Sequence, residues 1–205
     1  MIHPGRIRKG YNPPPMSRFR WVLRVAAAAG VASAVAGAAA ADGVRPSGSV
    51  AGPGVSRPPL WAPREWALSA GVFDLAKGDR AEGGLEARFE PVGFRLFGRD
   101  WEIEPGLGAL GTEDGSFYGY FSLRVPVEFG SSRWRAVPFT GGGVYSAGDG
   151  KDLGGPVEFR SGLEVSVEVG ERARVGLVYS HISNAVLYDR NPGAESLALT
   201  VAFRP

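Results

Sequence analysis

Three polar side chains near the end of the chain have the types and the spacing of an ester-hydrolysing site. His181 and Ser183 close an alternating apolar run at 175–183, and Glu195 opens the next run at 195–203. A serine hydroxyl becomes a nucleophile when a histidine accepts its proton and an acid orients the imidazole. Successive side chains of a strand point to opposite faces, so all three share a face with the apolar residues of their runs. This pattern is compatible with a Ser-His-Glu esterase site on an apolar surface.

The segment between the two runs carries candidate oxyanion donors. Residues two apart on a strand lie about 7 Å apart along the backbone, and facing residues of neighbouring strands have Cβ atoms about 5 Å apart. The developing oxyanion needs preorganised donors, and Asn184 and Asn191 supply amide groups in the joining segment. A histidine near a membrane interface can also be a simple interfacial polar group, and Asn-Pro-Gly at 191–193 is an ordinary turn signal. Spacing alone leaves both interpretations open.

Alternating apolar and polar positions with Gly-rich breaks indicate that the chain from residue 64 onward is built from strands. We expect strands at 66–72, 82–97, 101–109, 117–129, 134–145, 157–169, 175–183 and 195–203. The run at 82–97 loses its phase around Pro91 and Gly93, and such residues inside a strand usually mark a bulge. There are eight strands if this run is one bulged strand and nine if it is a tight hairpin.

One face of these strands carries Glu, Arg, Ser and Tyr, and the other carries Val, Leu, Phe and Trp. The apolar face would line the inside of a soluble sandwich or lipocalin-like barrel, but it would face lipid in a membrane barrel. An export signal, the absence of cysteine, the dyad alternation and charges of both signs on the polar face favour lipid. The sequence therefore predicts an all-β fold, an eight-stranded antiparallel transmembrane β-barrel of the outer-membrane type. We expect its lumen to be filled by ion pairs that include Glu158, Arg160, Glu164 and Glu168.

The orientation of such a barrel places the three polar residues at the outer surface. If both ends of the barrel lie in the periplasm, the last strand runs from the outer surface inward. His181, Ser183 and Glu195 would then lie at the height of the outer-leaflet headgroups, on the lipid-facing side. The expected location is therefore the bacterial outer membrane, and a nucleophile at this place would meet lipid.

The first part of the chain has the features of an export signal. Three arginines, at 18, 20 and 24, precede a run of small apolar residues that ends in alanines at 39–41. A basic segment, an apolar segment and small residues at the cleavage site predict a secretory signal peptide at 1–41, with Met16 as an alternative start. Residues 42–63 are rich in Gly, Pro and Ser and are expected to form a flexible lead-in. The barrel and its catalytic site are assigned to 64–205.

The composition of the chain beyond the signal excludes several functional classes. Six of the 23 basic residues and none of the 21 acidic residues lie in 1–41, so the rest of the chain has 17 basic and 21 acidic residues. Nucleic-acid binding therefore loses its support from charge. Without cysteine there is no disulfide framework and no thiolate chemistry, and His181 is the only histidine after the signal. A multi-histidine metal site within one chain is excluded, and we expect no metal and no cofactor.

The two segments around the candidate site resemble a known signature. His181-Ile182-Ser183-Asn184-Ala185, followed by Asn191-Pro192-Gly193-Ala194-Glu195-Ser196, is similar to the closing motif of the lipid A 3-O-deacylase family, PagL. The spacing agrees, with serine at +2, asparagine at +10 and glutamate at +14 from the histidine. The resemblance is specific over 138–205 and weak before that.

The resemblance implies a membrane-embedded enzyme with an eight-stranded barrel. Ser183 would be the nucleophile, His181 the base, Glu195 its orienting acid and Asn191 an oxyanion donor, with Asn184 as a second donor. The implied reaction is hydrolysis of the ester-linked acyl chain at the 3-position of lipid A, the lipid of outer-leaflet lipopolysaccharide, without a cofactor. Such a barrel is also compatible with a homodimer.

Two other functions fit the same barrel. A phospholipase-type esterase would use the same three residues on glycerophospholipids. A non-catalytic outer-membrane barrel with a structural or adhesive role would leave lipid composition unchanged when Ser183 is replaced.

Overall fold

The computed structural model describes residues 62–76, 80–129 and 133–205. The predicted signal peptide at 1–41 and all but the last two residues of the predicted lead-in at 42–63 lie outside the described residues. The described chain forms ten strands, which are β1 (Glu65–Phe73), β2 (Arg80–Arg88), β3 (Val92–Leu96), β4 (Arg99–Thr112), β5 (Phe117–Arg124), β6 (Val127–Glu128), β7 (Trp134–Ser146), β8 (Val157–Val169), β9 (Ala173–Ser183) and β10 (Ala194–Phe203). None of the described residues belongs to a helix that is long and apolar enough to cross a bilayer.

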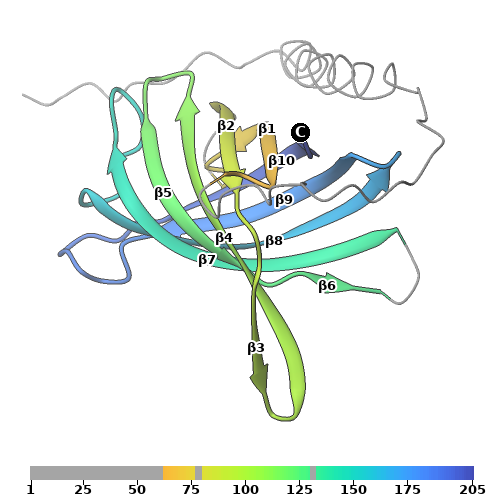
Figure 1. Ribbon diagram of the computed structural model, residues 1–205. Coiled ribbons are helices and arrows are strands. Elements are labelled where there is room, and N and C mark those ends of the chain that lie inside the picture. The colour runs from red at the N-terminus through yellow and green to blue at the C-terminus, as the bar shows by residue number, and fades with distance from the viewer. Residues whose placement is uncertain (1–61, 77–79, 130–132) are drawn as a thin grey trace, which may run out of the picture.

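Eight of these strands close into an antiparallel barrel (Figure 1). The order around the ring is β1, β2, β4, β5, β7, β8, β9 and β10, and β10 pairs back with β1. The closing ladder runs from Trp66 opposite Phe203 to Phe73 opposite Ser196. The predicted eight-stranded antiparallel barrel is therefore confirmed, and the ring pairs the backbone groups of its strands as a bilayer requires.

The barrel is polar inside and apolar outside. On β5, Tyr118, Tyr120 and Arg124 are buried in the lumen, whereas Phe117 and Phe121 point outward and are more than half exposed. A soluble barrel would bury its apolar residues and expose its polar ones. The wall of this barrel has the reverse arrangement, which is the one that faces lipid.

A network of buried ion pairs fills part of the lumen. The Arg88 guanidinium lies 2.8 Å from the Glu65 carboxylate, 3.0 Å from that of Glu86 and 2.7 Å from that of Glu164. Arg124 bridges the last two carboxylates, at 3.2 Å from Glu86 and 2.6 Å from Glu164. These residues come from β1, β2, β5 and β8, so the network joins distant parts of the wall. The predicted ionic role of Glu164 is therefore confirmed, and pairing is what makes such buried charges tolerable.

The other predicted members of the network behave in different ways. Glu168 joins it through Arg174, at 2.9 Å. Arg160 donates a hydrogen bond to the Ser180 hydroxyl at 3.1 Å. Glu158 is fully buried, and its carboxylate forms no hydrogen bond with the described residues. The prediction of ion pairing was wrong for Glu158 and for Arg160, neither of which forms an ion pair with the described residues, because the ion pairs gather away from the end of the barrel where β8 begins.

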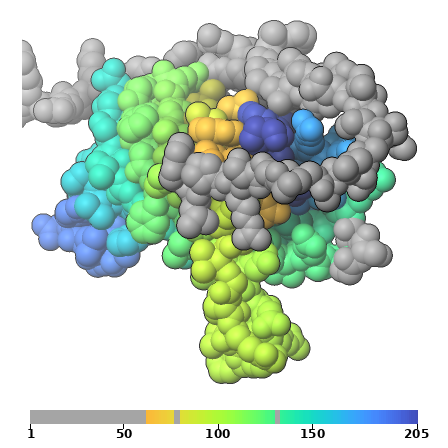
Figure 2. Space-filling model, in the orientation of Figure 1, coloured from red at the N-terminus to blue at the C-terminus, as the bar shows by residue number. Residues whose placement is uncertain are grey.

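The run at 82–97 is neither one bulged strand nor a hairpin closed on itself. β2 ends before Pro91, and β3 pairs with the first residues of β4 and not with β2. The turn between β3 and β4 consists of Phe97 and Gly98, which both have positive φ, at 51° and 75°. Such backbone angles favour a tight two-residue hairpin. Figures 1 and 2 show this β3–β4 hairpin projecting from the barrel.

Candidate active site

The candidate site lies on the outer wall, where β9 ends and β10 begins. His181 and Glu195 are direct partners across these two strands. The His181 Nδ1 atom is 3.2 Å from the Glu195 Oε1 atom, and the side chains are 43% and 35% exposed. When Nδ1–H donates to a carboxylate, the other ring nitrogen, Nε2, is left as an acceptor for a proton. The pair therefore has the arrangement of a base and the acid that orients it.

Ser183 lies two residues beyond His181 on the same outward face, and it is partly exposed. Its partner across the β8–β9 ladder is Phe159. Among the described residues, no hydrogen bond joins the Ser183 hydroxyl to the His181 ring. Catalytic hydrogen bonds are often long in a substrate-free site and tighten when the substrate binds.

Gly193 packs against the free edge of the imidazole. A Cβ atom at this position would lie 2.8 Å from His181 Cε1 and 3.3 Å from His181 Nε2. Gly193 also has a φ of 56°, in the left-handed region that glycine adopts without strain. Only a residue without a side chain lets the backbone approach the Nε2 edge this closely, so Gly193 belongs to the site. The Asn-Pro-Gly turn signal indicated its conformation, but not its contact with the ring.

Asn184 is completely buried, and its side chain is fully used in holding the joining segment. Its Nδ2 group donates to the carbonyl oxygens of Leu153, at 2.9 Å, and Arg190, at 2.7 Å. Its Oδ1 atom accepts from the Val186 backbone N–H at 3.1 Å. An amide has two N–H groups, so both are occupied here. The side chain therefore has no donor left for an oxyanion.

Asn191 is exposed at the start of the Asn-Pro-Gly turn, and its amide is oriented by Asn184. The Asn184 backbone N–H donates to Asn191 Oδ1 at 3.1 Å. Because the oxygen of this amide is engaged, its Nδ2 group is directed away from Asn184. Among the described residues Nδ2 forms no hydrogen bond, so its two N–H groups are available to a ligand.

The turn directly after the site is held in an unusual backbone conformation. Ala185 and Val186 have positive φ values of 51° and 66°. Positive φ is a genuine outlier for a β-branched residue such as valine and costs free energy. The Asn184 Oδ1 atom bonds to the Val186 N–H, and the Asn184 carbonyl accepts from the Leu187 N–H at 3.0 Å. Asn184 thus stabilises the strained turn from both its side chain and its backbone.

A second loop, at 147–156, packs against the loop at 184–193 that joins β9 to β10. Leu153 is almost fully buried and packs in one apolar cluster with Ile182 and Ala194, which flank the site in sequence. A Cβ atom on Gly154 would lie 2.0 Å from the Arg190 carbonyl oxygen, so the two loops meet backbone to backbone. Figure 1 shows both loops at the same end of the barrel. The sequence did not indicate this support, because it depends on the register between β7, β8 and β9.

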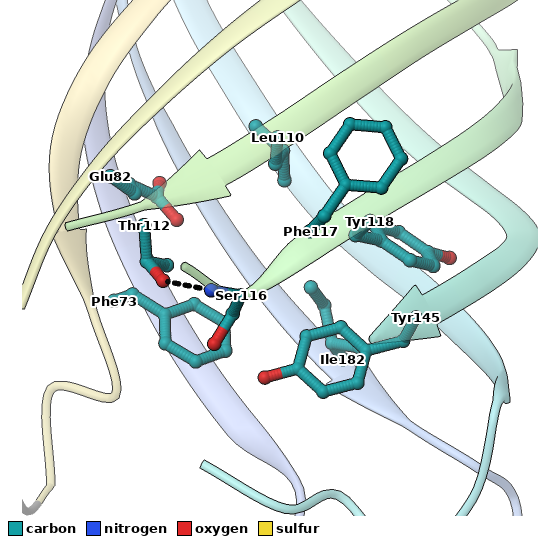
Figure 3. Close-up of a pocket in the computed structure, with 9 residues that line it drawn as sticks. All are labelled: Phe73, Glu82, Leu110, Thr112, Ser116, Phe117, Tyr118, Tyr145 and Ile182. Carbon is teal, nitrogen blue, oxygen red and sulfur yellow. Dashed lines mark hydrogen bonds between the residues drawn. The ribbon is translucent and has the colours of Figure 1, made fainter. Parts of the chain in front are cut away.

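Figure 3 shows a small pocket near the same end of the barrel. It is lined by Tyr118, Tyr145 and Ile182 among others, and Ile182 points inward between His181 and Ser183. The lining tyrosines hold nearby backbone in place, since Tyr118 donates to the Glu158 carbonyl at 2.9 Å. This bond stabilises the inner side of this end of the barrel, while His181, Ser183 and Glu195 face outward.

No group of three or more His, Cys, Asp or Glu side chains in the described part of the chain is arranged to hold a metal ion. The polar groups of the site are instead an imidazole, a carboxylate, a hydroxyl and an amide. These are the groups of acyl transfer by a serine nucleophile.

The chain is similar to known proteins in sequence family and in fold. The family model for lipid A 3-O-deacylase (PagL) matches residues 81–204. The fold is similar to the crystal structure of the outer membrane enzyme PagL, with a TM-score of 0.57 and 18% identity over 69% of this chain and 99% of that chain. A de novo designed transmembrane β-barrel has a TM-score of 0.42 and 10% identity, over 70% of this chain and 97% of that chain. No curated protein matches the chain.

The match to the family model covers more than half of the chain, including all three candidate catalytic residues. The likeness to the solved enzyme shows the fold. Family membership, together with the lipid-facing wall of the barrel, confirms the predicted location in the bacterial outer membrane. The homodimer stays a prediction, as does the division into signal peptide, lead-in and barrel. The chain belongs to the lipid A 3-O-deacylase (PagL) family.

Proposed function

We propose that the chain removes the ester-linked 3-O-acyl chain of lipid A by a Ser183-His181-Glu195 mechanism. The observation that carries this proposal is the His181–Glu195 contact on the lipid-facing wall, two residues from an outward serine. Family membership supplies the substrate class. A site on the outer wall suits a substrate that is itself a lipid of the outer leaflet.

The first half of the reaction transfers the acyl chain to the enzyme. His181 Nε2 takes the proton of the Ser183 hydroxyl, and the oxygen forms a bond to the ester carbonyl carbon. Glu195 holds the imidazole through Nδ1–H and stabilises its positive charge. When the tetrahedral intermediate collapses, the bond to the sugar oxygen breaks, and this oxygen takes the proton from His181. The products of this half are an acyl-serine and a free 3-hydroxyl on the sugar.

The second half returns the enzyme to its starting state. Water gives a proton to His181 and attacks the acyl carbon, and the proton passes to Ser183 as its bond to the acyl carbon breaks. The released product is a fatty acid. No other reactant is needed, because each proton that His181 takes is given back within the same half-reaction.

Asn191 is proposed to stabilise the negative oxygen of both tetrahedral intermediates. Its Nδ2 group is available, and its orientation is set by the bond from the Asn184 N–H to its Oδ1. Oriented donors of this kind cost no reorganisation during the reaction and typically stabilise the transition state by several kcal/mol. Asn184 is given a different role from the one expected from the sequence. It positions Asn191 and the strained turn, because its own amide is occupied.

The experiment that tests the proposal is mass spectrometry of lipid A from Gram-negative cells that express the chain or its Ser183→Ala variant. Loss of one 3-hydroxyacyl chain with the wild type alone would support the reaction and the nucleophile together. Unchanged lipid A with both proteins, at equal amounts folded in the outer membrane, would overturn the proposal. Phospholipids measured in the same extracts identify the phospholipase alternative, which predicts that those lipids lose chains instead.

A further inference from the structure

Polar side chains are distributed unevenly over the lipid-facing wall. The outward positions in the barrel portions of β1, β2, β4 and β5 are apolar or glycine, for example Phe117, Gly119, Phe121 and Leu123 on β5. Outward hydroxyl and charged groups gather on β7, β8, β9 and β10 instead. Two of them, Thr140 on β7 and Ser161 on β8, have no role in the mechanism derived above.

Thr140 and Ser161 lie in the same row across the strands as the base and its acid. Glu195 is paired with His181, His181 with Ser161, and Ser161 with Thr140. On β5 the row continues with Leu123. Neighbouring strands are about 4.8 Å apart, so Ser161 is as close to His181 on one side as Glu195 is on the other.

The next row toward the loops contains the nucleophile and is apolar beyond it. Ser183 is paired with Phe159, which is paired with Gly142. A Cβ atom on Gly142 would lie 3.3 Å from the Phe159 ring and 3.5 Å from the Phe121 ring, so the two rings close over this glycine. An acyl chain held at Ser183 would therefore lie on an aromatic surface, with the hydroxyls of Ser161 and Thr140 along one edge.

Both hydroxyls are exposed on this surface, and they form no hydrogen bond with other side chains in the described part of the chain. A hydroxyl without a partner in an apolar environment costs free energy. Facing Ser and Thr residues on neighbouring strands can interact through their hydroxyls. The Ser161 and Thr140 hydroxyls can therefore donate and accept hydrogen bonds at a place where lipid acyl chains offer no partner.

We propose that Ser161 binds the 3-hydroxyl group of the acyl chain that is removed, with Thr140 positioning the Ser161 hydroxyl. The inference rests on the proposed function and adds to it a residue that determines specificity, one that distinguishes the 3-hydroxyacyl ester from a plain acyl ester. In the 3-hydroxyacyl ester the hydroxyl is two carbons from the reacting carbonyl, so it lies beside the nucleophile and not along the tail. A plain fatty acid ester leaves the two hydroxyls unpaired, which is how a polar site rejects an analogue that lacks the group.

The test compares two synthetic substrates and uses the full chain folded in lipid-detergent micelles. Each substrate is an acylated glucosamine 1-phosphate with an ester at the 3-position, carrying either 3-hydroxytetradecanoate or tetradecanoate. The wild type is expected to prefer the hydroxylated ester by about tenfold in kcat/KM, the effect of about one hydrogen bond. Ser161→Ala should remove this preference by slowing the hydroxylated ester alone, and Ser161→Thr should keep it. Thr140→Val should reduce the preference in part.

The matched control is Ser146→Ala. Ser146 is an exposed, outward serine at the end of β7, where its partner is Phe117, so it lies outside the row of His181. This variant should leave the preference unchanged. All four substitutions place residues on the wall that suit a lipid-facing surface, and the slower gel mobility of heated samples checks that each barrel is folded.

Two results would overturn the inference while leaving the deacylase in place. One is a wild type that hydrolyses both esters at equal rates. The other is a Ser161→Ala variant that slows both esters equally, which would assign Ser161 to the sugar or to general packing. A wild type that hydrolyses neither ester, although it is folded, would instead count against the proposed function.

Discussion

Ser180 and His181 are neighbours in β9 but lie on opposite faces of the barrel wall. Ser180 is fully buried in the lumen, where its hydroxyl accepts a hydrogen bond from Arg160. His181 points outward, and its only side-chain partner among the described residues is Glu195. The charged side chains of the central network, Arg88, Arg124 and Glu164, are paired with one another, whereas the polar groups outside keep hydrogen-bonding capacity. The inner face therefore stabilises the barrel, and the outer face is available to a substrate.

The largest effect that separates the two faces is expected for Ser183→Ala. The rate of acyl release should fall by on the order of 10⁴-fold or more, because the nucleophile is lost. The free energy of unfolding should change by less than about 0.5 kcal/mol, since the hydroxyl has no partner in the described part of the chain. Acyl release by the purified variant and its urea unfolding midpoint measure the two quantities. A destabilised barrel would contradict the separation of the faces.

Glu164→Ala should have the converse effect. It leaves the guanidinium groups of Arg88 and Arg124 without their shared, fully buried carboxylate. Breaking a buried ion pair by removing one partner costs about 3–5 kcal/mol of stability. The urea midpoint should fall, while the rate per folded molecule stays within about twofold of the wild type. Glu168→Ala is the control, because this carboxylate is 44% exposed and should contribute less than about 1 kcal/mol.

Asn191→Ala tests the outward amide as an oxyanion donor. Loss of one such donor typically lowers kcat by about 10²–10³-fold. Asn191→Asp separates donation from loop support, because aspartate keeps an oxygen for the Asn184 N–H but lacks the Nδ2 donor. Steady-state kinetics should show a similar loss for both variants. Wild-type activity in the aspartate variant would exclude the donor role.

Gly193→Ala should displace the imidazole. The added Cβ atom would lie 2.8 Å from His181 Cε1, and a displacement of about 1 Å at a reactive group can cost about 10²-fold in rate. Gly170→Ala controls for backbone strain, because Gly170 also has positive φ, at 70°, but has nothing near its Cβ position. Equal kinetic losses in the two variants would assign the effect to strain and not to the contact with His181.

The smallest effect is expected for Arg190→Ala. Arg190 pairs with Asp152 at 3.0 Å between the two loops of the site, but both side chains are more than half exposed. Exposed pairs contribute about 0–1 kcal/mol, so kcat should change by less than about twofold. The buried bonds of Asn184 hold the same two loops, and Asn184→Ala should therefore lower kcat far more. A large loss with Arg190→Ala would show that the outer ion pair, and not Asn184, positions the site.

Alternation of residue types was sufficient to predict the barrel and the face on which the site lies. Period two assigns each side chain to a face regardless of how the strands are paired, so the inverted polarity could be predicted from the sequence. The pairing of His181 with Glu195 was compatible with the sequence but not predicted by it, because alternation does not fix the register between β9 and β10. Alternation could not predict the structure of the run at 82–97. Its second part, β3, pairs with β4 across the Phe97–Gly98 turn, and alternation does not indicate pairing partners.

The roles of individual polar residues depended on tertiary contacts. Asn184 and Asn191 are the same residue type in the same loop, and only the burial of Asn184 under the loop at 147–156 distinguishes them. Ser161 and Thr140 attract no notice in the sequence, because serine and threonine are common in strands. Their position beside His181 depends on the β7–β8 and β8–β9 registers.

The site's location on an outer wall, and not in a cleft, determines how the proposed reaction would depend on concentration. Enzyme and substrate would meet by lateral diffusion within one leaflet, so the relevant quantity is the mole fraction of substrate among the membrane lipids. Adding inert lipid at a constant bulk substrate concentration should therefore slow the reaction by surface dilution. The released fatty acid would also leave sideways within the same leaflet, because the described residues place no lid over the outer wall.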